Sequence, residues 1–212
     1  MTHPVTVSAV VLAAGLSSRM GGSHKLLLDW GGEPILRRVV RTVLAVEPVE
    51  VVVVTGYRAP EIRVALDGLP VRFVHNAAFS EGQPGSVVTG MRALRGFYDA
   101  IMIVLGDQPL LSPVALSCLI EAYRTVPAGR SILVPARAGQ RGNPVMLAAR
   151  YNSEIQAGRM KLGCRRLIES YPDQVALIEM EDDAFFLDCD TPEDYAALRV
   201  RLGQTPSAVS PS

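Results

Sequence analysis

The sequence has no surplus of charge of either sign. Its 21 Lys and Arg residues balance 21 Asp and Glu residues, so the formal net charge at neutral pH is zero. Proteins that attract nucleic acid or an anionic membrane over a distance usually carry a basic surplus. We therefore expect neither nucleic acid nor a membrane among the partners of this chain.

Cysteine and histidine are also scarce. The three cysteines lie far apart and none belongs to a CxxC pair. This spacing favours neither a zinc site nor a disulfide framework. The three histidines show no spacing typical of a catalytic triad. Reduced thiols are the rule inside the cell, so we expect a cytoplasmic protein.

The two ends of the chain are simple. Residues 1–4 carry no basic targeting segment, and the apolar run that follows is too short to span a bilayer. A length of 212 residues suits one domain with a sizeable core. We expect a single domain over residues 5–203, and a flexible tail over residues 204–212, where Pro, Ser and Ala dominate.

Short apolar runs alternate with helical patterns along the chain. The apolar runs predict buried strands at residues 5–14, 49–55, 71–74, 99–105 and 131–135. Weaker patterns suggest extended segments at residues 26–29, 144–148, 174–180 and 185–187. This alternation predicts an α/β fold with a mixed, mostly parallel sheet and helices on both faces. Ligands of such sheets bind outside the carboxyl ends of the strands.

A glycine-rich loop follows the first predicted strand. It contains Gly15 and Gly21, and it carries two cations, Arg19 and Lys25. Glycines let backbone N–H groups approach an anion closely, and cationic side chains add full charge. The loop therefore favours a polyanion site, although a surface loop with solvated cations would look similar.

The common phosphate loops do not match this segment. A Walker A loop needs Ser or Thr after its lysine, and Lys25 is followed by Leu26. The Rossmann pattern needs a second glycine two residues after Gly15, and none is present.

The loop instead resembles the signature L-A-[AG]-G-x-S-x-R-M-G-x(n)-K. The matching residues are Leu12-Ala13-Ala14-Gly15, Ser17, Arg19-Met20-Gly21 and Lys25-Leu26-Leu27. This signature is typical of the nucleotidyltransferases that attach a nucleotide to the molybdopterin cofactor, and the likeness extends to about residue 195. It implies the nucleotide-diphospho-sugar transferase type of α/β fold. It also implies that Arg19 and Lys25 hold a triphosphate, with the backbone of Leu12, Ala13, Ala14 and Gly15 under the base.

Two further segments resemble the acidic motifs of the same family. Asp107 follows a predicted strand in the sequence GDQP. Asp188 and Asp190 are the first and third residues of the sequence DCDTPEDY. Mg²⁺ takes oxygen ligands and usually one or two carboxylates. The resemblance implies a Mg²⁺ ion on Asp107 and Asp190, with Asp188 the weaker candidate. Turn formation and loop solvation are the plain alternatives.

Two other loops resemble substrate-binding elements of that family. Gly82 and Ser86 are implied to contact the base or ribose, although GQPGS replaces the usual GMSSS. Ser86 is also expected to cap a helix over residues 87–94. Asn143 and Pro144 match a G-[NH]-P element near the acceptor; a plain hairpin turn is the alternative reading.

The resemblance implies a reaction. Ala14 stands where guanylyltransferases of the family have Gly, so we expect transfer of CMP from CTP to the phosphate of molybdopterin, with release of pyrophosphate. A molybdenum hydroxylase or dehydrogenase apoenzyme is a possible recipient. The alternatives are a guanylyltransferase with a related acceptor, or a non-catalytic factor that binds and delivers the finished cofactor.

Overall fold

Strand β1 (Val7–Ala13) lies inside the sheet and every one of its residues is buried. It pairs in parallel with β2 (Val51–Thr55) on one side and with β4 (Ala100–Leu105) on the other. A strand without polar alternation is expected where both faces are covered. The computed structural model describes residues 5–21, 23–157 and 163–204, so the expected tail lies outside it except for Gln204.

The other strands extend this centre into a mixed sheet. The order is β3-β2-β1-β4-β7-β5-β6, and β8 pairs in parallel with β5. Strand β7 runs antiparallel to both β4 and β5. The remaining strands are β3 (Arg72–His75), β5 (Ile132–Arg137), β6 (Gln140–Arg141), β7 (Val145–Ala148) and β8 (Val175–Glu179). The predicted mixed, mostly parallel α/β sheet is confirmed.

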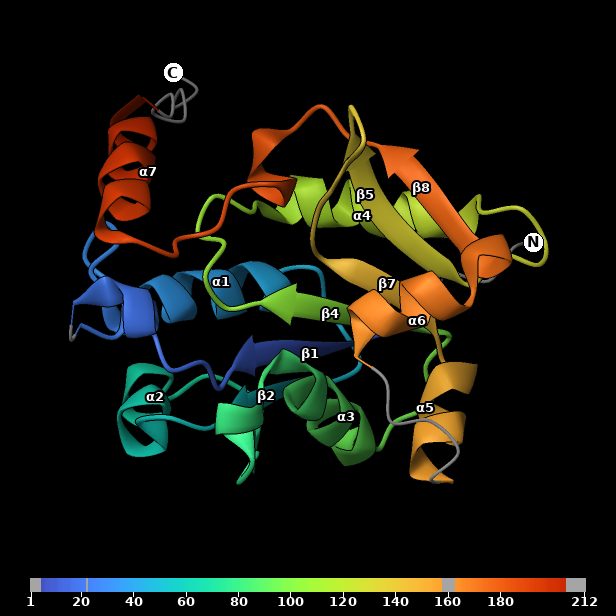
Figure 1. Cartoon of the computed structure of the whole chain (residues 1–212), viewed down its shortest axis with the longest axis horizontal. Coiled ribbons are helices and arrows are strands. Elements are labelled where there is room, and N and C mark those ends of the chain that lie inside the picture. Colours follow the sequence, from blue (N-terminus) through green and yellow to red (C-terminus); the bar gives the residue numbers. More distant parts are fainter. Residues whose placement is uncertain (1–4, 22, 158–162, 205–212) are drawn as a thin grey trace, which may run out of the picture.

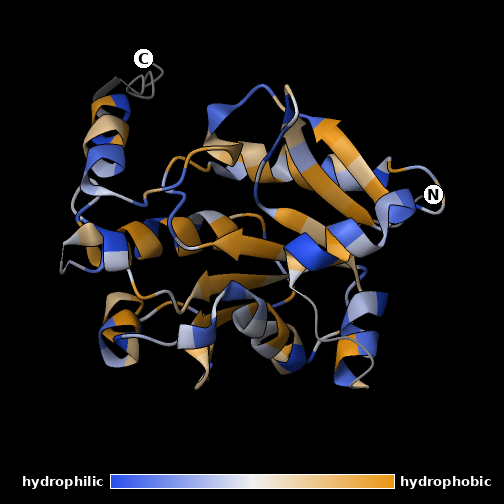
Figure 2. Ribbon diagram, in the orientation of Figure 1, coloured by the Kyte–Doolittle hydropathy of each residue, from blue (hydrophilic) through white to orange (hydrophobic). Residues whose placement is uncertain are grey.

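Helices cover both faces of the sheet, as Figures 1 and 2 show. Side chains of β1 alternate between two cores, with Val11 in one and Val10 in the other. The first core includes side chains of α1 and α4, and the second includes those of α3, α5 and α6. The helices are α1 (Ile35–Leu44), α2 (Ala59–Ala65), α3 (Gln83–Ala93), α4 (Pro113–Arg124), α5 (Arg150–Gln156), α6 (Cys164–Ser170) and α7 (Pro192–Gln204).

Two short segments expected as strands are helical turns. Lys25–Leu27 form a 3₁₀ turn, η2, in which Leu27 N donates to His24 O at 2.9 Å. Asp183–Phe185 form another, η5, and Phe185 is buried in the first core. In each segment a large apolar side chain packs into the core from a turn. Burial therefore accounts for these short apolar runs, and neither run forms the expected strand.

The expected helix cap at Ser86 is also wrong. Helix α3 begins at Gln83, directly after Gly82, so Ser86 lies within its first turns. The Ser86 hydroxyl accepts a hydrogen bond from Asn76 Nδ2 at 3.0 Å instead of binding a helix N–H group.

None of the helices in the described ranges is long and apolar enough to cross a membrane.

Close packing of α3 on the sheet gives a stability prediction. A Cβ atom at Gly90 would lie 2.3 Å from Val10 Cγ1 and 2.7 Å from Val54 Cγ2, both in the second core. A Cβ at Gly85, in the same helix, would meet only Asn76 Nδ2 at 3.5 Å. Gly90→Ala should lower the free energy of unfolding by about 1–3 kcal/mol through overpacking.

Gly85→Ala is the matched control. It should leave stability unchanged or raise it by up to about 1 kcal/mol, because Ala favours a helix. Urea denaturation of both variants tests this, and equal effects would contradict the packing argument.

Candidate active site

The carboxyl ends of β1 and β4 bring two predicted loops together. Leu12 pairs with Leu105, so the glycine loop that follows β1 begins next to the turn that contains Asp107. The segment before α7 joins them, because Cys189 N donates to Asp107 O at 2.9 Å. Residues distant in the sequence thus form one polar cluster.

The start of α7 fixes the backbone beside Asp190. Asp194 Oδ2 accepts hydrogen bonds from the N–H groups of Thr191 and Asp190, at 2.8 and 3.2 Å. Asp194 N in turn donates to Thr191 Oγ1 at 3.1 Å. This reciprocal arrangement is a capping box with Thr191 as the cap.

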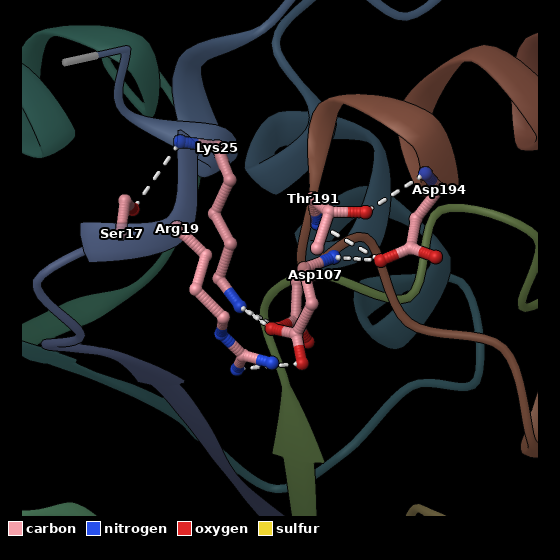
Figure 3. A network of polar contacts seen from close by, with 7 residues as sticks. Ser17, Arg19, Lys25, Asp107, Thr191 and Asp194 are labelled. Atoms are coloured by element: carbon pink, nitrogen blue, oxygen red, sulfur yellow. Dashed lines mark hydrogen bonds and ion pairs between the residues drawn. The ribbon is translucent and has the colours of Figure 1, made fainter. Parts of the chain in front are cut away.

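Lys25 lies at the centre of the cluster (Figure 3). Its ammonium group donates to Asp107 Oδ2 and, at 2.7 Å, to Asp190 Oδ1. Its backbone N–H donates to Ser17 Oγ at 3.3 Å. Arg19 approaches the second oxygen of Asp190, with 2.8 Å between its guanidinium and Oδ2. The Lys25 side chain is 15% exposed and that of Arg19 is 65% exposed, so one cation is inside the cavity and the other at its mouth.

For Lys25 and Asp190, the effect of neighbouring opposite charges on the pKa outweighs the effect of burial. Burial would lower the pKa of Lys25, but Asp107 and Asp190 raise it above its usual value. Burial would raise the pKa of Asp190, but Lys25 and Arg19 lower it. Lys25 is therefore charged and Asp190 ionised at neutral pH.

A third carboxylate completes an acidic group. One oxygen from each of Asp107, Asp188 and Asp190 can be chosen so that all lie within 4.8 Å of one another. The pKa of Asp188 is raised, first by burial and then by the neighbouring charges of Asp107 and Asp190. Asp107 Oδ1 is buried and has no hydrogen-bond partner within the described part of the chain. An all-oxygen set with an unsatisfied buried carboxylate oxygen fits a hard divalent cation.

The cluster lines one end of a cavity of about 360 Å³. Most of the residues predicted for the site line it: Leu12, Ala14, Gly15, Arg19, Lys25, Gly82, Ser86, Asp107 and Asp190. A Cβ atom at Gly15 would meet nothing within 4 Å, so its backbone is open to a ligand. Ala13 is not among the lining residues, because it belongs to the core on the opposite face of the sheet.

Asn143 and Pro144 are not among the lining residues either. Asn143 N donates to Phe185 O at 2.9 Å, which ties this turn to η5. The pairing of Val145 with Ile103 brings the turn towards the end of β4. These two residues therefore lie close to the site without contributing to the cavity wall.

Several wall residues were not predicted from the sequence, and two of them flank Gly82 in the chain. Phe79 and Gln83 line the cavity on either side of Gly82. Phe79 is an aromatic residue of the kind that is common in cores, so no sequence pattern indicated a binding role for it. Gln83 stands in the GQPGS segment, whose departure from the usual motif was the only signal at this position.

Comparison with known proteins shows the family. A family model described as the MobA-like NTP transferase domain matches residues 9–177. The chain belongs to this family. It is therefore a nucleotidyltransferase. Its cavity is lined by Leu12, Ala14 and Gly15, which stand at the start of the signature described above.

Individual relatives carry several names. A probable molybdenum cofactor guanylyltransferase from Natronomonas pharaonis is 29% identical over 199 residues, which cover 92% of this chain and 98% of the relative. A nicotine blue oxidoreductase from Paenarthrobacter nicotinovorans is 30% identical over 196 residues, covering 91% and 96%. The structure of a nucleotidyl transferase from Methanothermobacter superposes with a TM-score of 0.79 at 29% identity, covering 95% of this chain and 99% of the other.

The acidic group gives a prediction about stability and pH. Because the folded state raises the pKa of Asp188 above its ordinary 3.8, ionisation of Asp188 disfavours folding at neutral pH. Asp188→Asn should raise the free energy of unfolding at pH 7 in the presence of a chelator. The gain should shrink as the pH falls through the raised pKa towards 3.8.

Asp190→Asn is the matched comparison. It should lower stability at pH 7, because Lys25 and Arg19 lose their ionised partner. Thermal unfolding across a pH series measures both effects. Destabilisation by Asp188→Asn at pH 7 would contradict this account of the electrostatics.

Proposed function

We propose that this enzyme transfers CMP from CTP to the phosphate of a molybdopterin-type acceptor and releases pyrophosphate. The observation that carries this proposal is the single cluster formed by Lys25, Arg19, Asp107 and Asp190 at the end of an open cavity. Cations and metal-binding carboxylates at one point are what an attack on the α-phosphorus of a nucleoside triphosphate requires.

The two cations would act on the phosphates. An oxygen of the acceptor phosphate attacks the α-phosphorus, and the bond to pyrophosphate breaks. Lys25 would bind the triphosphate inside the cavity, while the exposed Arg19 would contact it from the mouth. Their charge stabilises the negative charge that develops on the leaving pyrophosphate.

Asp107 and Asp190 would hold a Mg²⁺ ion, with Asp188 close enough to support it. When bound, the ion supplies positive charge to the phosphate oxygens. The carboxylates also fix the position of Lys25, so this chain orients its cation and its metal ligands through the same contacts.

The base would lie over the backbone from Leu12 to Gly15. Ala14 adds a methyl group where guanylyltransferases of the resembling family have glycine, and this methyl hinders a purine more than a pyrimidine. Ser86 is engaged with Asn76, so its hydroxyl retains only part of its hydrogen-bonding capacity for a ligand. Gln83 is the further polar wall residue that could contact the base or ribose.

The acceptor would approach from the side of Asn143 and Pro144, next to the end of β4. The product would pass to a molybdenum hydroxylase or dehydrogenase apoenzyme. A guanylyltransferase is the second candidate, because a relative that spans nearly the whole chain carries that name. A non-catalytic carrier is disfavoured, since it has no use for a metal-triphosphate cluster.

Release of pyrophosphate from CTP in the presence of Mg²⁺ and molybdenum cofactor tests the activity. Asp107→Asn should abolish turnover, because the site loses a metal ligand with an otherwise unsatisfied buried oxygen. Circular dichroism should show an unchanged fold, since Asp107 lies at a strand end outside both cores.

Arg41→Gln is the control, because Arg41 is exposed on α1 and pairs with Glu33. Full magnesium-dependent activity in Asp107→Asn would refute the metal assignment. Absence of nucleotidyl transfer in the wild-type protein with either CTP or GTP would refute the proposed reaction itself.

Nucleotide choice is a separate prediction. We expect CTP to exceed GTP in kcat/KM by about 10- to 200-fold, the scale of one methyl-sized clash. Ala14→Gly should narrow the difference by raising the value for GTP. Paired kinetics with both nucleotides measure this, and a wild-type preference for GTP would make the enzyme a guanylyltransferase.

A further inference from the structure

We propose that Lys25 makes the binding of the divalent cation depend on the nucleotide, because its ammonium group competes with the cation for the same carboxylate oxygens. This inference rests on the proposed function for the identity of the triphosphate. It concerns the order and coupling of binding, which the reaction itself does not determine.

The competition concerns the four carboxylate oxygens of Asp107 and Asp190. Lys25 takes Oδ2 of Asp107 and Oδ1 of Asp190, and Arg19 takes Oδ2 of Asp190. Of these four atoms, Asp107 Oδ1 is the one without a hydrogen-bond partner among the residues that the structure describes. Three of the four oxygens of the two proposed metal ligands are therefore engaged by side-chain cations of this chain.

Burial makes the Lys25 contacts difficult to replace. Its side chain is only 15% exposed, and charges interact more strongly away from bulk water. A divalent cation that takes the two oxygens held by Lys25 displaces the ammonium group and leaves it buried without an anion, which costs free energy. A triphosphate removes this cost, because its oxygens offer Lys25 and Arg19 new anionic partners.

Nucleotide and divalent cation should therefore bind with positive coupling. Thermodynamic linkage requires each to raise the affinity of the other by the same factor. Without the ammonium group, Asp107, Asp188 and Asp190 would repel one another, and a divalent cation would relieve that repulsion directly.

Lys25→Met tests this, because it removes the charge and keeps an unbranched apolar stem. Mn²⁺ serves as the probe, with binding followed by electron paramagnetic resonance, in the presence and absence of an α,β-methylene analogue of CTP. For the wild-type protein the analogue should tighten Mn²⁺ binding at least about tenfold, the scale of one charge-assisted hydrogen bond. Lys25→Met should bind Mn²⁺ alone at least about tenfold more tightly than wild type, and lose most of the coupling.

Arg41→Gln is the charge-matched control, since it removes one cation that pairs with Glu33 and does not line the cavity, and it should change neither quantity. Circular dichroism verifies that Lys25→Met is folded. Mn²⁺ affinity in folded Lys25→Met that equals or falls below the wild-type value would overturn the proposal.

The wild-type measurement stands on its own if the variant does not fold. Mn²⁺ affinity that is independent of the analogue would overturn the inference, even in a protein that turns over CTP. Strong coupling in a protein that transfers no nucleotide to molybdenum cofactor would support the inference and refute the proposed acceptor instead.

Discussion

The parallel pairing of β1 with β2 and β4 is the constraint on which the rest of the structure depends. It requires helices on both faces, because a strand that is buried along its whole length has no polar side. It also brings the ends of β1 and β4 to one edge of the sheet. The sheet therefore brings the glycine loop and Asp107 to the same edge, and the ion pairs of Lys25 add a direct contact between them.

The sequence predicted those parts that local patterns determine. Continuous β-branched runs identified the buried strands. At the start of α4, Ser112 precedes Pro113 and its hydroxyl accepts a hydrogen bond from Ala115 N, which is the usual chemistry of a helix cap. The strand-then-loop pattern also marked Arg19, Lys25 and Asp107 as candidates, because loops that follow buried parallel strands lie at the ligand edge of the sheet. The family resemblance added Asp190, which no strand pattern could have placed beside the others.

The errors occurred where tertiary contacts override a short pattern. Leu26 and Phe185 are apolar residues in runs of three and four, and such short runs are ambiguous between a strand and a buried turn. Ser86 has a side chain that is common at helix caps, but α3 begins three residues earlier. Asn76, from the preceding loop, donates a hydrogen bond to the Ser86 hydroxyl. Phe79 and Gln83 could not be assigned to the cavity wall, because only the path of the loop after β3 brings them there.

The balance of charge within the site explains why this chain needs no basic surface to bind a polyanion. Lys25 and Arg19 face Asp107, Asp188 and Asp190, so the cluster has one more carboxylate than it has cations. A triphosphate alone would be repelled by the extra carboxylate. A triphosphate with a divalent cation brings positive charge that balances the carboxylates. Under the proposed function, the acidic residues would favour the metal-bound nucleotide over the free nucleotide. Selection of this kind operates over a few ångströms, where screening by salt is weak, and it is compatible with a molecule whose net charge is zero.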